Sequence, residues 1–153
     1  MPVRNDPRMV VEAMAAHEGA IGDLYAAYAI QFREAADLWR AMADEEHTHA
    51  QMLHGLLQKA DELRVFVDAD RFNPVALRTS REYVVEQTRV VEGSSLSLRT
   101  ALAIAIQLEG ALIESRAFEV FDSDTVSVRT TLDRLREDTA RHRQRLRDRL
   151  AGL

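Results

Sequence analysis

The chain of 153 residues has no cysteine, only three prolines and only six glycines. Without cysteine there is no disulfide, no thiolate nucleophile and no zinc or iron–sulfur site held by sulfur. Any bound metal must therefore be held by histidine and carboxylate side chains, which favour iron, manganese or zinc. The scarcity of proline and glycine removes the residues that most often interrupt helices.

Long apolar runs are also missing. Uninterrupted runs such as residues 101–106 are far shorter than the roughly 20 residues that cross a bilayer, and the N-terminus lacks the apolar stretch of a secretory signal. We therefore expect a soluble, cytoplasmic protein with no membrane partner. The net charge of −5 gives no general reason to expect nucleic acid. Residues 134–149 hold seven arginines and a smaller number of aspartates and glutamates. The simplest interpretation of this segment is a helix face exposed to solvent.

Composition and periodicity predict the fold class. Hydrophobic residues make up 46% of the chain, enough for one sizeable core, and no segment has the pattern of a strand. We predict one all-α domain over residues 1–153, an antiparallel four-helix bundle with one long crossover between the second and third helices. The helices are expected at about 8–32, 35–60, 95–121 and 125–150, with a crossover at 61–94 that contains a short helix from about 80 to 92.

Each predicted helix carries an apolar stripe with alternating spacings of three and four residues, which is typical of bundle helices. Polar residues interrupt every stripe near its middle: Glu18 in the first helix, Glu46 and His49 in the second, Glu109 in the third, and Thr139 and His142 in the fourth. A polar residue on a buried stripe needs a partner, because burying it alone costs several kcal/mol.

The second and fourth helices repeat each other. MADEEHTHAQML at 42–53 aligns without a gap with LREDTARHRQRL at 135–146, which pairs Glu46 with Thr139 and His49 with His142. Each half of the chain thus consists of a helix with one central glutamate, a short turn, and a helix with a polar pair three residues apart.

These spacings are expected to bring the polar residues together. Glu18 lies about 15 residues before the turn near Arg33, and Glu46 and His49 lie about 13 to 16 residues after it, so both are roughly 20 to 24 Å from the turn. The second half has similar spacing. If the two hairpins face each other, three carboxylates and two imidazoles converge in an apolar core, where metal ions are the natural partner for their charge.

The ordered set of motifs resembles the ferritin-like superfamily, and most closely its rubrerythrin-like branch. The resemblance covers about residues 9–150 and is carried by Glu18 with Tyr25 seven residues later, Glu46-x-x-His49, Glu109 and His142. It implies a di-iron centre that reacts with peroxide or dioxygen, with Glu18, Glu46, His49, Glu109 and His142 as ligands. It also implies a homodimer, which apolar residues of the crossover at 65–67 favour as well, although these residues could equally cover the bundle's own core.

The sequence departs from the family pattern in the second half. Thr139 stands where a ligand glutamate is expected. A site with two divalent ions and three glutamates would therefore keep one positive charge, which hydroxide, a solvent anion or another acid would have to balance. Asp138 and Glu114 are the candidate acids, and neither is well placed on an ideal helix. Leu112 occupies the position of the additional glutamate of peroxide-reducing members. The cysteine-rich electron-transfer module is missing too, so the electron donor must be a separate protein or small molecule.

Two classes of function follow. The first is a redox metalloprotein that oxidises ferrous iron with dioxygen or peroxide. The second is a degenerate bundle with one metal ion or none that serves as a binding or assembly module, for example through its arginine-rich fourth helix.

Single residues also have structural alternatives. Glu46 and His49 could form an exposed ion pair, Glu109 could pair with Arg116 in the core, and His142 could be a core histidine. Tyr25 could donate a hydrogen bond near the cluster, act as a radical sink or simply fill the core. His17, His47 and His54 lie off the stripes and are expected at the surface.

Overall fold

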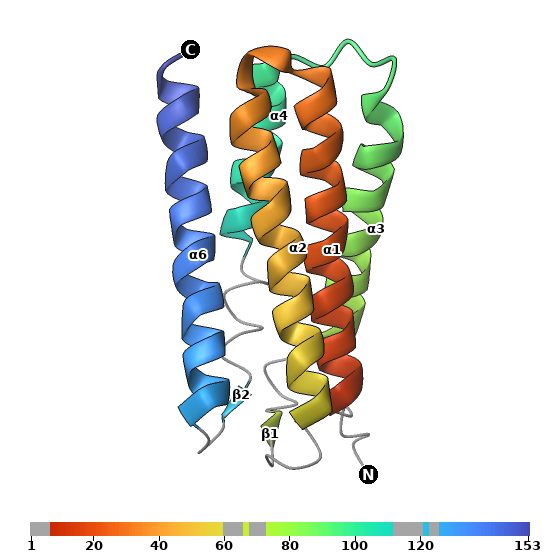
Figure 1. Ribbon diagram of the computed structural model, residues 1–153. Coiled ribbons are helices and arrows are strands. Elements are labelled where there is room, and N and C mark those ends of the chain that lie inside the picture. The colour runs from red at the N-terminus through yellow and green to blue at the C-terminus, as the bar shows by residue number, and fades with distance from the viewer. Residues whose placement is uncertain (1–6, 60–65, 68–72, 112–120, 123–125) are drawn as a thin grey trace.

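The computed structural model describes residues 7–59, 66–67, 73–111, 121–122 and 126–153, which form a helical bundle (Figure 1). The all-α class is thereby confirmed. The helices are α1 (Pro7–Gln31), the 3-10 turn η1 (Arg33–Ala35), α2 (Ala36–Lys59), α3 (Pro74–Val91), α4 (Leu98–Gly110) and α6 (Val126–Ala151). Two short strands, β1 (Phe66–Val67) and β2 (Phe121–Asp122), pair antiparallel.

The helices pack as neighbours along the bundle axis. η1 joins α1 to α2 at the upper end of Figure 1, and these two helices lie side by side along their length. α3 lies along the other side of α1, and α4 packs against α6, which stands at the edge of the bundle and also contacts α2. None of the described helices combines the length and the apolar character needed to cross a membrane.

The crossover helix is longer than predicted. α3 begins at Pro74, because the side chain of Asn73 accepts hydrogen bonds of 3.1 Å from the backbone N–H groups of both Val75 and Ala76. The next helix begins at Leu98 rather than near residue 95, since Ser97 caps it by accepting from Thr100 N at 3.1 Å. The turn before it uses Gly93 at a φ of +76°, which glycine adopts without strain.

The prediction of one continuous helix over 95–121 is wrong, because the helix does not continue through Ala111. α4 ends at Gly110, and Ala111 has the non-helical angles φ −59° and ψ 130°. Glycine at this point also leaves room for the Arg143 side chain of α6, because a Cβ on Gly110 would lie 3.2 Å from Arg143 Nε. Leu112, Glu114 and Arg116 lie outside the described residues. The β1–β2 pair was not expected either, since two residues are too few to give a periodic signal.

A polar layer divides the apolar core in two. One cluster contains Trp39, Tyr25 and Leu146, and the other contains Met14 and Leu135. Between them lie the buried polar residues that we call the polar layer: His17, Glu18, Glu46, His49, Glu109, Asp138, Thr139 and His142. The predicted stripes of α1, α2 and α6 are thus buried, with their polar interruptions at one height.

Candidate metal centre

The five predicted ligands meet inside the bundle. Glu18 comes from α1, Glu46 and His49 from α2, Glu109 from α4 and His142 from α6, and none of the five is more than 4% exposed. The expectation that they converge is confirmed. An exposed ion pair is therefore excluded as the environment of Glu46 and His49.

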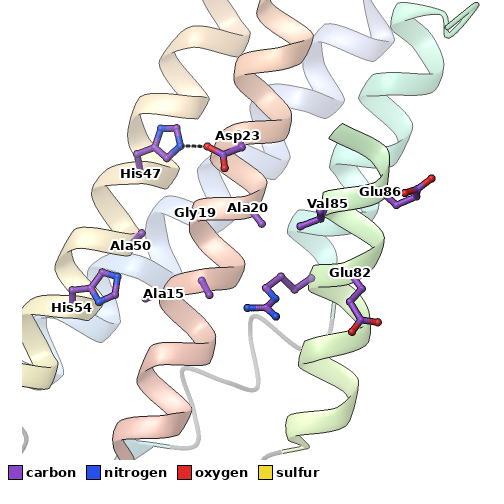
Figure 2. A pocket seen from close by; sticks show the side chains of 12 residues that line it. Ala15, Gly19, Ala20, Asp23, His47, Ala50, His54, Glu82, Val85 and Glu86 are labelled. Carbon is purple, nitrogen blue, oxygen red and sulfur yellow. Dashed lines mark hydrogen bonds and ion pairs between the residues drawn. The ribbon is translucent and has the colours of Figure 1, made fainter. Parts of the chain in front are cut away.

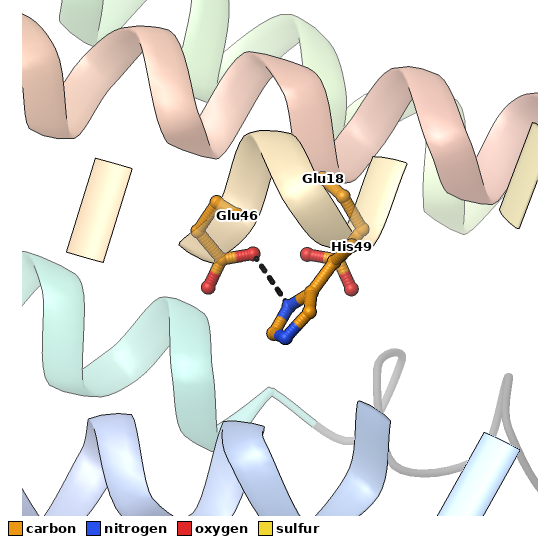
Figure 3. A group of neighbouring side chains, drawn as sticks. All are labelled: Glu18, Glu46 and His49. Carbon is orange, nitrogen blue, oxygen red and sulfur yellow. Dashed lines mark ion pairs between the residues drawn. The ribbon is translucent and has the colours of Figure 1, made fainter. Parts of the chain in front are cut away.

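The ligands form two groups that share one residue. Glu18, Glu46 and His49 make the first group, and Glu46, Glu109 and His142 make the second. In each group, one ligand atom from every residue lies within 4.8 Å of the others, so these groups could hold metal ions. Figure 3 shows the first group, in which the two carboxylates and the imidazole converge. Because Glu46 has two oxygens, it can serve both groups at once.

Both imidazoles turn Nδ1 toward the carboxylates. His49 Nδ1 lies 3.5 Å from Glu46 Oε2, and His142 Nδ1 lies 2.9 Å from Glu46 Oε1 and 3.6 Å from Glu109 Oε1. The two rings stack with centroids 5.5 Å apart. Each ring therefore presents the same nitrogen to the cluster from its own helix.

Two further carboxylates hold the outer nitrogens of these rings in a crossed pattern. His49 Nε2 on α2 lies 3.0 Å from Asp138 Oδ2 on α6, while His142 Nε2 on α6 makes a short contact with Glu45 Oε2 on α2. A carboxylate at Nε2 keeps the proton on that nitrogen and leaves the Nδ1 lone pair for a metal ion. The arrangement suits two histidine ligands.

Sequence reasoning missed this role of Asp138 and Glu45. Asp138 was considered only as a substitute ligand, and Glu45 was assigned to the flank or surface of its helix. The repeat contained the signal, because the alignment of 42–53 with 135–146 pairs Glu45 with Asp138. Both lie one position before the aligned pair Glu46 and Thr139.

Two buried atoms of the cluster support occupation by a cation. His49 Nδ1 and Glu109 Oε2 have no hydrogen-bond partner among the described residues. Buried polar atoms are nearly always bonded in native proteins, so an atom of this kind calls for an explanation. Metal ions in the two groups would bind one of these atoms each, since His49 belongs to the first group and Glu109 to the second. Nitrogen with carboxylate oxygen is the donor set that iron, manganese and zinc accept.

Tyr25 contacts the centre and belongs to the core at the same time. Its side chain is fully buried, and its hydroxyl donates a 2.8 Å hydrogen bond to Glu109 Oε1. Its ring packs on Trp39 with centroids 5.3 Å apart. Tyr25 therefore fixes the orientation of the Glu109 carboxylate from the apolar side.

Thr139 supplies no carboxylate to the second half of the site. It is buried, and its hydroxyl donates to the carbonyl of Leu135 in its own helix at 2.9 Å. Asp138 does not replace the missing glutamate, because its carboxylate faces the outer nitrogen of His49. The cluster of described residues thus contains three carboxylates, from Glu18, Glu46 and Glu109.

The charges of the two imidazoles differ when no metal is bound. Burial opposes a charge on His142, but the contacts with Glu109 and Glu46 outweigh burial and raise the pKa of His142 to about 11. Burial, together with the charge on His142, lowers the pKa of His49 to about 4. His142 is then the cation of the cluster, and a metal ion bound at its Nδ1 must displace a proton.

His17 is buried, which contradicts the prediction that it lies at the surface. It is only 1% exposed, and its Nε2 lies 2.9 Å from Ser80 Oγ on α3. The prediction failed because α3 packs along this side of α1, which the spacing of residues within α1 does not show. His47 and His54 lie outside the core as predicted, and His47 pairs with Asp23 at 2.9 Å.

A groove of about 630 Å³ lies over α1 between α2 and α3 (Figure 2). Small residues such as Ala15, Gly19 and Ala20 line it, and His47 and Asp23 form its ion pair. None of the five ligands borders it, so this groove is separate from the metal centre.

Comparisons of the chain with protein-family models, with curated proteins and with solved structures gave no match. Function is therefore inferred from the side chains and their geometry.

Burial of His17 predicts a specific loss of stability in acid. Burial lowers the pKa of His17 to about 4, the charge of Glu109 opposes this change and that of Arg81 adds to it. Because this pKa is below the value of 6.5 in the unfolded chain, the unfolded state binds the proton first. The stability contribution is complete above pH 6.5 and is lost as the pH falls toward 4, by on the order of 3 kcal/mol.

Denaturant unfolding with chelator present checks this expectation. His17→Gln should show a shallower fall in unfolding free energy between pH 6.5 and 4 than the wild type, and His54→Gln, at an exposed position, should follow the wild type. Identical slopes for all three proteins would contradict the account of His17.

Proposed function

We propose that the chain is a ferritin-like, rubrerythrin-like metalloprotein that binds two iron ions and oxidises ferrous iron with dioxygen or peroxide. The observation that carries the proposal is the pair of buried ligand groups joined at Glu46. Iron, when bound, would supply the electrons that reduce the oxidant. A carboxylate shared between two ions is the usual way to hold them about 3.5 to 4 Å apart.

The arrangement of the helices supports a ferritin-like, antiparallel four-helix bundle. α1 pairs with α2 and α4 pairs with α6, while the connection between the two pairs runs through α3. This is the order that two helical hairpins with one long crossover would give. Each pair contributes one glutamate from its first helix and one histidine from its second.

Each residue of the centre has a definite task in this proposal. Glu18 and His49 would hold one ion, Glu109 and His142 would hold the other, and Glu46 would contribute to both groups. Asp138 and Glu45 keep the outer nitrogens of the histidines protonated, and the hydroxyl of Tyr25 holds the Glu109 carboxylate in place. The apolar clusters above and below exclude water.

Charge balance indicates an external anion. Two divalent ions carry four positive charges and the three glutamates carry three negative ones, so a centre with neutral histidines keeps a charge of +1. A fourth glutamate at position 139 would neutralise it, but Thr139 cannot. Hydroxide or another anion would therefore complete the centre.

A metal-free binding module is the second candidate. The contacts of His142 with Glu46 and Glu109 favour it, because a charged imidazole between two carboxylates balances much of the cluster without any metal. The surface of α6, with exposed arginines such as Arg136 and Arg147, would then be the functional feature.

Anaerobic loading with ferrous iron separates the two candidates. After removal of free iron, we expect about two irons per chain in the wild type and less than one in Glu46→Gln, since Glu46 belongs to both groups. Glu137→Gln, an exposed site on α6, is the matched control and should bind like the wild type. Addition of dioxygen or peroxide should then produce ferric absorbance in proteins that hold iron. A wild-type chain that stays metal-free, and whose thermal unfolding does not respond to iron, would establish the second candidate instead.

Restoring the missing carboxylate should strengthen the second metal position. The Thr139 hydroxyl donates to Leu135 of its own helix, so within the described residues Thr139→Glu removes no hydrogen bond between helices. We expect the variant to bind the second iron several-fold more tightly, because the added charge neutralises the centre. Thr139→Gln has nearly the same size without the charge and serves as control. Unchanged iron stoichiometry and affinity in Thr139→Glu would show that position 139 does not face the centre.

A further inference from the structure

A pocket of about 340 Å³ opens between α2 and α6 beside the metal centre. Its lining includes Arg134, Asp138, Arg141 and Arg145 from α6, and Glu45 with His49 from α2. Since His49 is a candidate ligand and only 1% exposed, the pocket reaches from the surface to the edge of the centre.

The two carboxylates in the pocket are already engaged. Asp138 contacts His49 and Arg141, with Arg134 Nε 3.8 Å away, and Glu45 contacts His142 and Arg145. They have little capacity left for a cation, which the neighbouring arginines would also repel.

The three arginines, in contrast, have spare donors. A guanidinium carries five N–H groups, and a carboxylate uses at most two of them. The lining holds three arginines against two carboxylates, an excess of one positive charge among these five side chains. The side chains of Arg141 and Arg145 are 68% and 42% exposed, so both can turn toward a ligand without leaving a buried charge. The pocket is thus built for an anion.

We propose that this pocket binds a small tetrahedral oxyanion of the phosphate class, held by Arg134, Arg141 and Arg145. A dianion matches several guanidiniums better than a single carboxylate does. The volume also fits, since a water occupies about 30 Å³ and the pocket accommodates the anion with part of its hydration shell. If the proposed function holds, the anion lies next to a centre that lacks one negative charge, and the two ligands favour each other's binding.

Calorimetric titration of the metal-free full chain with inorganic phosphate, at constant ionic strength, tests the site independently of iron. We expect saturable binding by the wild type, and a dissociation constant about tenfold or more higher in the double variant Arg141→Gln, Arg145→Gln. The matched control is Arg136→Gln with Arg147→Gln, which removes the same charge from exposed positions on α6 outside the pocket lining. The control should bind phosphate within about twofold of the wild type.

A second titration, with glycerol 3-phosphate, distinguishes a phosphorylated metabolite from free phosphate as the ligand. Glycerol 3-phosphate that binds as tightly as inorganic phosphate indicates a phosphorylated metabolite, and exclusion of this ester indicates the free ion. The double variant Arg141→Lys, Arg145→Lys keeps the charge and should recover part of the affinity.

Absence of saturable phosphate binding by the folded wild type would overturn the proposal. Equal losses in the two glutamine double variants would overturn it too, because binding would then follow overall charge. Iron stoichiometry on the same samples keeps the two proposals distinct: phosphate binding without iron binding would refute the metal function and leave the oxyanion site in place.

Discussion

The stability of the bundle depends on how the charges of five buried ionisable groups compensate one another. Three carboxylates and two imidazoles are enclosed between two apolar clusters, where an uncompensated charge would cost several kcal/mol, a large share of a typical domain's total stability. Glu46 resolves this constraint, because it contacts both histidines and belongs to both ligand groups. Without metal, the charge on His142 compensates part of the cluster, and two divalent ions would exceed the charge of the three glutamates by one.

The internal repeat explains why the two histidines are held alike. Helices α2 and α6 each place a histidine on the buried stripe and an acid four positions before it, and each acid contacts the histidine of the other helix. Partial burial opposes ionisation of Glu45, yet its bond to His142 and the nearby Arg145 lower its pKa, which keeps this carboxylate charged. Among the polar residues on the buried stripes, the two helices differ where Glu46 of α2 aligns with Thr139 of α6. With two divalent ions bound, this difference would leave one positive charge at the centre, beside a pocket lined with arginines.

Much of the site could be predicted from the sequence, because stripe positions are set by helical geometry alone. Spacing predicted that Glu18, Glu46, His49, Glu109 and His142 come together, and the structure brings them together. For Tyr25 the sequence left a hydrogen bond near the cluster and core filling as alternatives, and the structure shows both. The burial of His17 could not be predicted, since it depends on where α3 packs. The roles of Glu45 and Asp138 depend on contacts between helices, which periodicity along one helix does not reveal. The end of α4 at Gly110 was missed because the apolar pattern itself does not stop there.

The central claim is that two metal ions lie side by side and share Glu46. Anomalous diffraction from crystals of the iron-loaded protein tests it most directly. The account predicts two peaks about 3.5 to 4 Å apart, one beside His49 Nδ1 and one beside His142 Nδ1, with Glu46 contacting both. A map without iron in the polar layer, or with iron bound only at surface residues, would contradict it.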